Sequence, residues 1–331
     1  MTIGYIGLGK MGLAQVKRLL EKGYGVVAYN RSEEPRRDAK KAGAEIAENL
    51  QELCEELSRP ERISNREIRT GKLIWLMVPH AAVDDVLAEL MPQLSKEDII
   101  IDGGNSFYKH SMRRAKELKR KGVHFLDCGT SGGPAGARAG ACLMIGGEQK
   151  IFKKHEQLFR DLSSTTPQVK HTDKPEIVGI LSREKMNGSY AYMGKAGAGH
   201  FVKMVHNGIE YGMMQAIAEG FEVMKRSKFK LSLRKVAEVY NHRSVVESRL
   251  IGWLKKAFDE HGEDLKDISG EVGQLGEGKW TIETAKELGV KVKVIEDSLE
   301  FRLRSKGNPS YTGQVVSALR NQFGGHTVKK H

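Results

Sequence analysis

The chain has 331 residues, more than one ordinary hydrophobic core organises, so two domains are expected. Its 39% hydrophobic and 29% charged residues are typical of soluble globular proteins, and no apolar run approaches the roughly 18 residues of a membrane span. The formal net charge of +12 favours anionic ligands. Because the basic residues are spread out and form no nucleic-acid-binding motif, we expect a small phosphorylated partner, with no nucleic acid and no membrane.

The N-terminal residues, MTIGYIGLGKMG, contain neither the basic segment nor the cleavage site of a signal peptide. The three cysteines, Cys54, Cys128 and Cys142, are scattered and form no CxxC pair, as is common in a reducing cytosol. These features predict a cytoplasmic protein.

In chain order, the first half alternates short apolar strands with amphipathic helices. The pattern predicts strands at 2–7, 24–30, 72–79, 98–104, 123–129 and 141–147, and helices at 11–23, 47–57, 83–94 and 111–122. This alternation indicates an α/β fold with a parallel, doubly wound sheet. The polar segment 58–71 is expected to be a solvated insertion before the third strand.

The second half is predicted to be helical. A helix over 199–227 would have about 30 residues and span on the order of 45 Å. Further helices are expected near 232–241, 244–259, 281–288, 292–305 and 310–322. The change in pattern falls in an irregular stretch, 171–195, so we predict one domain over 1–175 and an all-helical domain over 196–331.

The segment GLGKMG places Gly7, Gly9 and Gly12 in GxGxxG spacing between the first strand and the first helix. The first glycine permits a tight turn, the second lets a pyrophosphate approach the backbone, and the third lets the helix pack closely on the strand. The amides at the helix N-terminus then face the anion. This context predicts a Rossmann-like dinucleotide-binding domain.

The end of the second strand bears on the choice between NAD and NADP. An NAD site usually has an acidic residue there to hold the ribose 2′-hydroxyl, whereas this chain has Asn30, Arg31 and Ser32. Arginine and serine can bind a 2′-phosphate, and Arg36 and Arg37 follow closely. The pattern favours NADP, although Arg31 could instead stack on adenine and discriminate little.

Two polar loops follow successive strands at the sheet edge where ligands bind in such folds. The segment DGGNS offers the Asn105 side chain, and GTSGGPAGA offers Ser131 with the backbone amides of Gly132 and Gly133. Each loop by itself is as consistent with a turn as with a site, but two at neighbouring strand ends favour a site.

The segment KMVHNGIEYG gathers Lys203, His206, Asn207, Glu210 and Tyr211 within one predicted helix. At about 100° per residue these side chains fall on an arc of roughly 140°, so they share one face. A solvated face could have this composition, and the alternative is that a ligand lies against it. A lysine there serves as a general base only if burial or neighbouring cations lower its pKa, which is about 10.4 when free.

Together, GLGKMG, NRS, DGGNS, SGG, GAGHFVKMVHNGIEYG, GQLGEGKWT (273–281) and LRNQFGGH (319–326) make the sequence resemble 6-phosphogluconate dehydrogenase of the decarboxylating type, within the β-hydroxyacid dehydrogenase superfamily. The resemblance spans nearly the whole chain, and its length matches the short form of the family. It implies that the N-terminal domain binds the dinucleotide, while the helical domain binds substrate and forms a homo-oligomer, dimer or tetramer.

The resemblance implies a role for each matching position. Lys203 would be the general base and Glu210 the acid, and no metal would be needed. The implied substrate residues are Asn105, Ser131, Gly132, Gly133, His206, Asn207, Tyr211, Lys279, Thr281, Arg302, Arg320 and His326. The implied cofactor residues are Gly7, Leu8, Gly9, Lys10, Met11, Gly12, Asn30, Arg31, Ser32, Val78 and Asn105.

Some of these roles are more specific. Tyr211, Lys279, Thr281 and Arg302 would hold a phosphate, with Arg304 as the alternative to Arg302, whereas Arg320 and His326 would reach in from a neighbouring subunit. The implied reaction is oxidative decarboxylation of 6-phosphogluconate to ribulose 5-phosphate and CO₂, with NADP or NAD. Two alternatives are another β-hydroxyacid dehydrogenase, such as 3-hydroxyisobutyrate dehydrogenase, and a non-catalytic NADP-binding relative.

Overall fold

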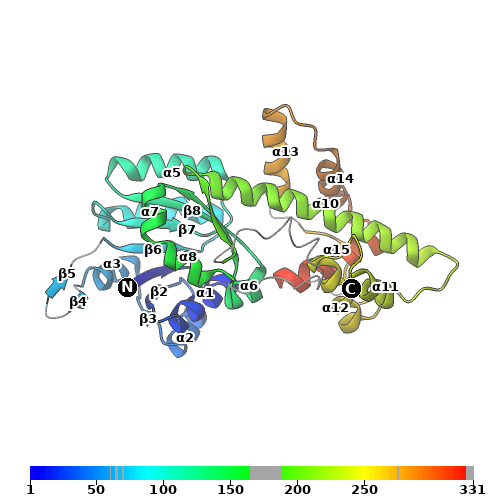
Figure 1. The fold of residues 1–331 in the computed structure, drawn as a ribbon, viewed down its shortest axis with the longest axis horizontal. Helices are drawn as coiled ribbons and strands as arrows, with labels where there is room; N and C mark the ends of the chain where they lie inside the picture. The colour runs from blue at the N-terminus through cyan, green and yellow to red at the C-terminus, as the bar shows by residue number, and fades with distance from the viewer. Residues whose placement is uncertain (60, 64–65, 69–70, 165–187, 274–275, 326–331) are drawn as a thin grey trace, which may run out of the picture. The chain divides into compact units, whose positions relative to one another are not determined.

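The structure, a computed structural model, describes the chain except for residues 60, 64–65, 69–70, 165–187, 274–275 and 326–331. The chain divides into two compact units, Met1–Lys203 and Met204–His331 (Figure 1). Each unit has its own buried apolar core.

The first unit contains one large sheet and one hairpin. The sheet has the order β10-β9-β8-β7-β6-β1-β2-β3, and all neighbours are parallel except β8 and β9. Its strands are β1 (Thr2–Ile6), β2 (Gly25–Tyr29), β3 (Glu45–Ile46), β6 (Leu73–Leu76), β7 (Ile99–Asp102), β8 (His124–Ser131), β9 (Cys142–Gly147) and β10 (Tyr190–Gly194). The hairpin pairs β4 (Glu61–Ile63) with β5 (Arg66–Ile68), within the predicted insertion.

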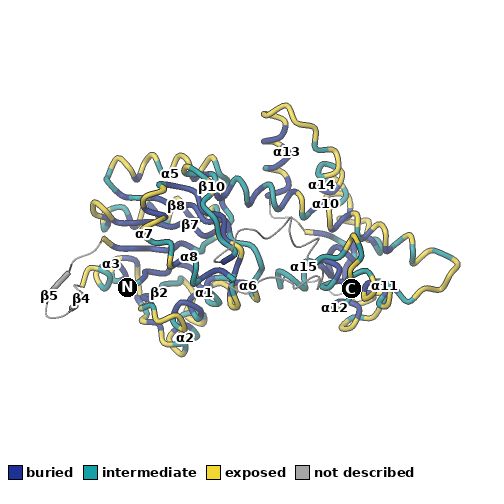
Figure 2. The backbone as a smooth tube through the Cα atoms, viewed as in Figure 1, coloured by how far each residue is buried: buried dark blue, intermediate teal, exposed yellow. Residues whose placement is uncertain are grey.

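Helices cover both faces of this sheet, whose central strands are buried along most of their length (Figure 2). In β6, Leu73 and Trp75 belong to one core, while Ile74 and Leu76 belong to the other, as the two-residue strand period requires. The first core includes α1 (Lys10–Glu21), α2 (Glu33–Lys41), α7 (Gln149–Lys154) and α8 (Glu156–Leu162), and the second includes α3 (Leu50–Leu57), α4 (Val83–Leu90) and α5 (Tyr108–Arg120). The predicted doubly wound fold class is confirmed.

The described residues of the second unit form helices joined by loops, with no strand among them. The long helix α10 (Ala198–Arg226) begins in the first unit and continues into the second. Phe221, Leu254, Phe258 and Leu319 are central to the core of this unit. The other helices are α11 (Leu233–Tyr240), α12 (Arg249–His261), α13 (Glu277–Glu287), α14 (Lys293–Arg304) and α15 (Tyr311–Gly324). None of the described helices combines the length and apolar character that crossing a bilayer requires.

The sheet departs from the prediction at three strands: β3, which was not predicted, β9 and β10. Strand β9 runs antiparallel to β8, because the connection between them, which contains only the short α6 (Gly133–Ala139), is too short for a parallel crossover. Strand β10 forms the edge of the sheet, in a stretch that was expected to be irregular. Four short helices, α2, α6, α7 and α8, and the single turn η1 (His80–Ala82) were not predicted. The turn η2 (Met91–Gln93) lies within the helix predicted over 83–94.

Helix α10 begins in close contact with the sheet. Its first turn has no local acidic residue, and instead the buried Asp127 of β8 accepts hydrogen bonds from the amides of Gly197 (2.7 Å) and His200 (2.8 Å). A Cβ atom on Gly199 would lie 2.3 Å from the carbonyl oxygen of Met144. The helix can therefore approach β8 and β9 only because residue 199 is a glycine.

Two glycines of α10 give a matched test of this contact. Gly199→Ala should lower the free energy of unfolding by about 1–3 kcal/mol, because backbone atoms stand where the new methyl group must go. Gly220→Ala, where a Cβ would meet nothing within 4 Å, should raise it by about 0.5–1 kcal/mol through helix propensity. Urea denaturation measures both, and equal effects would contradict the close packing.

Candidate active site

The loop between β1 and α1 has the geometry of an anion-binding turn. Gly7 has φ +100°, and a Cβ there would lie 2.3 Å from the carbonyl oxygen of Met77. A Cβ on Gly12 would lie 2.0 Å from the carbonyl oxygen of Gly7, which explains the third glycine. A Cβ on Gly9 would meet no protein atom within 4 Å, so this glycine leaves space that protein packing does not use.

That space lies at the N-terminus of α1, a helix of 12 residues that starts at Lys10. Its first turn has no acidic residue, and no side chain caps it. The amides at a helix N-terminus and a neighbouring lysine suit a phosphate group. The residues present therefore fit a dinucleotide pyrophosphate, with Leu8 and Met11 in the same turn.

At the end of β2, the side chain of Asn30 is used within the protein. Its Oδ1 accepts a hydrogen bond from the amide of Leu8 (3.0 Å), and its Nδ2 donates to the carbonyl of Ser32 (3.1 Å). Asn30 thus ties the glycine loop to the second strand. Arg31 beside it is exposed.

Arg36 and Arg37, the other two arginines of this region, form ion pairs with Glu48 and Glu33. Of the three arginines, Arg31 is therefore the one that best suits contact with a cofactor.

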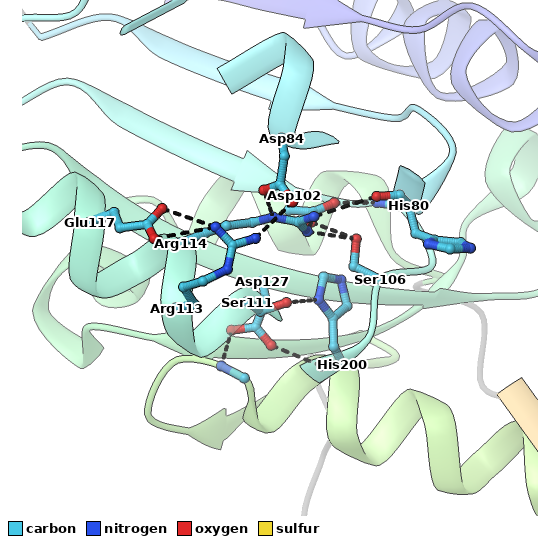
Figure 3. Close-up of polar contacts among 12 residues, drawn as sticks. His80, Asp84, Asp102, Ser106, Ser111, Arg113, Arg114, Glu117, Asp127 and His200 are labelled. Carbon is cyan, nitrogen blue, oxygen red and sulfur yellow. Dashed lines mark hydrogen bonds and ion pairs between the residues drawn. The ribbon is translucent and has the colours of Figure 1, made fainter. Parts of the chain in front are cut away.

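The loops after β6 and β7 contain Val78 and Asn105. A Cβ on Gly104 would lie 2.8 Å from the carbonyl oxygen of Val78, so the two loops are in close contact. Figure 3 shows the polar contacts of Asp102, Ser106 and Arg114. Asp102, at the end of β7, accepts hydrogen bonds from Ser106 (2.7 Å) and from the buried Arg114 (3.3 Å).

Lys203 lies beside the end of β8. It is buried, with 9% exposure, and a Cβ on Gly129 would lie 2.4 Å from the Cβ of Lys203. Two residues further along, Ser131 ends β8, and Gly132 (φ +127°) and Gly133 (φ +63°) turn the chain into α6. The structure thus brings the lysine and the serine–glycine loop together within the first unit.

In the second unit, α10 carries a connected polar group. The Nδ1 of His206 lies 3.1 Å from Oδ1 of Asn207 and 3.7 Å from Oε2 of Glu210. Asn207 and Tyr211 are buried, whereas His206 and Glu210 are partly exposed. A carboxyl group within reach of an imidazole can accept and return a proton, as an acid catalyst must.

Two arginines lie near Tyr211 in the same unit. The guanidinium carbon of Arg302 is 3.3 Å from the centre of the Tyr211 ring. Arg302 is 2% exposed, and its Nη2 has no hydrogen-bond partner among the described residues. Burial, together with the positive charge of Arg320, lowers the pKa of Arg302 to about 10, although Tyr211, Glu210 and Glu277 act in the opposite direction.

Burial likewise lowers the pKa of Arg320. Two cations with reduced solvation and one unpartnered N–H donor favour an anion at this place. The alternative residue, Arg304, is exposed and pairs with Glu300, so its side chain is outside this cluster.

The remaining candidates differ in their surroundings. Thr281 is buried, and its hydroxyl lies 2.9 Å from the carbonyl oxygen of Met204, which links α13 to α10. Lys279 is exposed and lies 3.7 Å from Glu283. His326 lies outside the described residues. Among the residues that are described, no group of three or more His, Cys, Asp or Glu side chains could hold a metal ion.

Asp127, Arg114 and Gly129, which support the loops and the lysine, were not among the predicted site residues. The available signal was an acidic residue at the end of an apolar strand, seen in DIIIDGG and VHFLDCG. An acid in such a position is buried and needs a partner, but the sequence does not tell which residue supplies it.

Comparisons with known proteins identify the family of the chain. A family model described as the NAD-binding domain of 6-phosphogluconate dehydrogenase matches residues 2–172, and one described as the C-terminal domain of that enzyme matches residues 199–331. YqeC of Bacillus subtilis (strain 168), which has a provisional 6-phosphogluconate dehydrogenase name, is 44% identical over 330 residues, with 100% of both chains covered.

Two further proteins have more definite descriptions. The NAD(+)-dependent, decarboxylating 6-phosphogluconate dehydrogenase of Haloferax volcanii is 38% identical, with 100% of this chain and 99% of that protein covered. A solved structure of Plasmodium falciparum 6-phosphogluconate dehydrogenase, described with NADP+ and with 6-phosphogluconate, has a TM-score of 0.74 and 30% identity, covering 93% of this chain and 64% of that one. Two family models and full-length relatives at these identities show that the chain belongs to the 6-phosphogluconate dehydrogenase family.

Proposed function

We propose that this chain oxidises and decarboxylates 6-phosphogluconate, giving ribulose 5-phosphate and CO₂ with reduction of NADP or NAD. The observation that carries the proposal is the buried Arg302 with its unpartnered nitrogen, near Arg320 and Tyr211. A dianionic phosphate would supply the missing hydrogen-bond acceptor and would offset the cost of burying two cations. A small hydroxy acid without phosphate would leave these groups unpaired.

The proposed chemistry assigns one proton transfer to Lys203 and another to Glu210, which lie on one face of α10. The neutral amine of Lys203 accepts the proton of the C3 hydroxyl. A dinucleotide held by the glycine loop would supply the hydride acceptor for C3. The product is a β-keto acid, which loses CO₂ once its carbonyl is polarised. The resulting ammonium of Lys203 stabilises the enolate oxygen, and Glu210 then protonates the carbon that lost CO₂.

The other candidates bind and orient the ligands in this proposal. Asn105, Ser131, Gly132, Gly133, His206 and Asn207 hold the sugar acid, and Tyr211, Arg302 and Arg320 hold its phosphate. Thr281 has its hydroxyl close to a backbone carbonyl, so it acts mainly by fixing α13 on α10. We propose residues 1–175 as the dinucleotide-binding domain and 196–331 as the domain that binds substrate and forms the dimer.

For the cofactor, we propose NADP in preference to NAD. The family includes relatives of both kinds, since one is described as NAD(+)-dependent and another from Bacillus subtilis as NADP(+)-dependent. The support within this chain is local: the end of β2 has no acidic side chain, Asn30 is engaged with the glycine loop, and Arg31 is exposed beside it.

We also propose a homo-oligomer in which the C-terminal residues, including His326, complete the site of a neighbouring subunit. Arg320 lies close enough to Arg302 of its own chain to lower that residue's pKa. We propose the same role for Arg320, which together with His326 would reach into the site of the neighbouring subunit.

The phosphate assignment can be tested with two neighbouring arginines of α14. Arg302→Met should lower kcat/KM for 6-phosphogluconate by about a hundredfold or more, because it removes a buried charge that pairs with the phosphate. Its activity on gluconate, which has no phosphate, should change little. Arg304→Met is the matched control, since Arg304 is exposed, and should leave both values near wild type. Equal losses on both substrates would remove Arg302 from the phosphate site.

The catalytic assignment predicts different defects at the two ends of the helix face. Lys203→Met should lower kcat by about a thousandfold or more while the dinucleotide still binds, as calorimetry would show. Glu210→Gln should slow protonation of the enediol more than hydride transfer, which rapid-mixing kinetics can separate. Turnover near wild type in Lys203→Met would require another base.

The cofactor assignment rests on Arg31. Arg31→Ala should raise the KM for NADP by about tenfold or more and that for NAD much less, since a charge-assisted hydrogen bond to the 2′-phosphate is lost. Arg37→Ala is the control, because that side chain is paired with Glu33. Equal increases for the two cofactors would mean that Arg31 only stacks on adenine.

A further inference from the structure

Arg114 of α5 makes a set of buried contacts that the proposed reaction does not yet use. It is 1% exposed, and its Nε donates to Oδ1 of Asp84 (2.7 Å). Its Nη1 donates to Oδ2 of Asp102 and to Oγ of Ser106 (both 3.3 Å), and its Nη2 lies 3.4 Å from the carbonyl oxygen of His80. Figure 3 shows the guanidinium at the centre of these partners.

These partners belong to three separate segments. His80 begins the turn that follows β6, Asp84 lies in the first turn of α4, and Asp102 with Ser106 lies at the end of β7 and in the loop after it. Strands β6 and β7 are parallel neighbours, so both loops leave the same edge of the sheet. This edge, at the carboxyl ends of the strands, is where such folds bind their ligands.

The two loops are the ones that contain Val78 and Asn105. They are in close contact, since a Cβ on Gly104 would come within 2.8 Å of the Val78 carbonyl oxygen. Ser106, next to Asn105, donates to the same carboxylate oxygen that Arg114 binds. A shift of the guanidinium would therefore be transmitted directly to the residue beside Asn105.

Burial of this ion pair is not explained by stability alone. Asp102 is fully buried, and an apolar pair of similar volume would usually stabilise a core as well as a buried ion pair does. A planar guanidinium with donors in fixed directions does something that an apolar pair cannot, because it sets the relative positions of several acceptors at once. Its bond to the partly exposed Asp84 is strong enough to hold the pKa of that carboxyl well below its usual range.

We infer that Arg114 is a positioning residue, which fixes the loop after β6 against the loop after β7 and thereby places Val78 and Asn105 for the cofactor and the sugar acid. This inference rests on the proposed function. It adds a role for Arg114, Asp102 and Ser106, none of which touches a ligand in the proposed mechanism.

The chain provides a matched control in the adjacent residue. Arg113 also binds Asp84 (2.7 Å), but it is half-exposed, and its second partner is Glu117 of its own helix. Arg113→Lys thus perturbs the same carboxylate without disturbing either loop. Arg114→Lys keeps the charge and removes the fixed directions of the guanidinium.

The experiment compares these variants with wild type in three measurements: the melting temperature without ligand, the Kd for NADP and NAD by calorimetry, and kcat and KM with 6-phosphogluconate. Arg114→Lys should lower kcat by about tenfold or more, because small displacements at a reacting centre are costly, and should weaken cofactor binding. The isotope effect on kcat with substrate deuterated at C3 should rise, as misplaced groups make hydride transfer slower. Arg113→Lys should match wild type throughout.

A structural role alone would give a different result. If Arg114→Lys lowers only the melting temperature and keeps the kcat, Kd and isotope effect of Arg113→Lys, the inference is wrong.

If Arg114→Lys does not fold, the Ser106→Ala variant tests the inference instead, because it removes one small hydroxyl between Asp102 and the loop. A lower kcat with a higher isotope effect in folded Ser106→Ala supports the inference, and wild-type values overturn it. Absence of 6-phosphogluconate turnover in wild type would instead overturn the proposed function.

Discussion

The hydrogen bonds between the carboxylate of Asp127 and the first turn of α10 are the contact on which the geometry of the candidate site depends. Asp127 is fully buried in β8 and accepts from the amides of Gly197 and His200, so it serves as the cap that the helix lacks in its own sequence. The helix dipole stabilises the carboxylate in return. Because the cap fixes the start of the helix on the sheet, Lys203 is held beside the end of β8, within the same unit as the serine–glycine loop.

A second buried carboxylate lies beside the first, on the neighbouring strand. Asp102 of β7 and Asp127 of β8 are register partners in neighbouring parallel strands, and both are fully buried. Each is satisfied by a different element, since Asp102 binds Arg114 and Ser106 of α5 and its preceding loop, whereas Asp127 binds backbone amides of α10. Two buried carboxylates at the ends of neighbouring strands thus fix two segments of the candidate site through hydrogen bonds.

The part of this arrangement that depends on neighbours in sequence could be predicted. The spacing of Gly7, Gly9 and Gly12 predicts a tight turn between the first strand and the first helix, and the periodicity around Lys203 predicts the helix face. The direction of β9, the pairing of β10 and the partners of Asp102 and Asp127 depend on residues far away in the chain. Local pattern could not choose between Arg302 and Arg304 either, because they are only two residues apart, and tertiary packing decides which side chain is buried.

The two units differ in how far the protein itself provides partners for buried charged groups. In the first unit, buried carboxylates have protein partners for their charge, so the local structure is complete without a ligand. In the second, Arg302 keeps a buried N–H donor without a partner among the described residues, and its charge is opposed by the nearby Arg320. Tyr211 and the acidic Glu210 and Glu277 offset part of that cost, which keeps the guanidinium charged at neutral pH while its hydrogen bonding stays incomplete. Such a group gains most from an anion that brings both charge and acceptors, and a phosphate ester provides both.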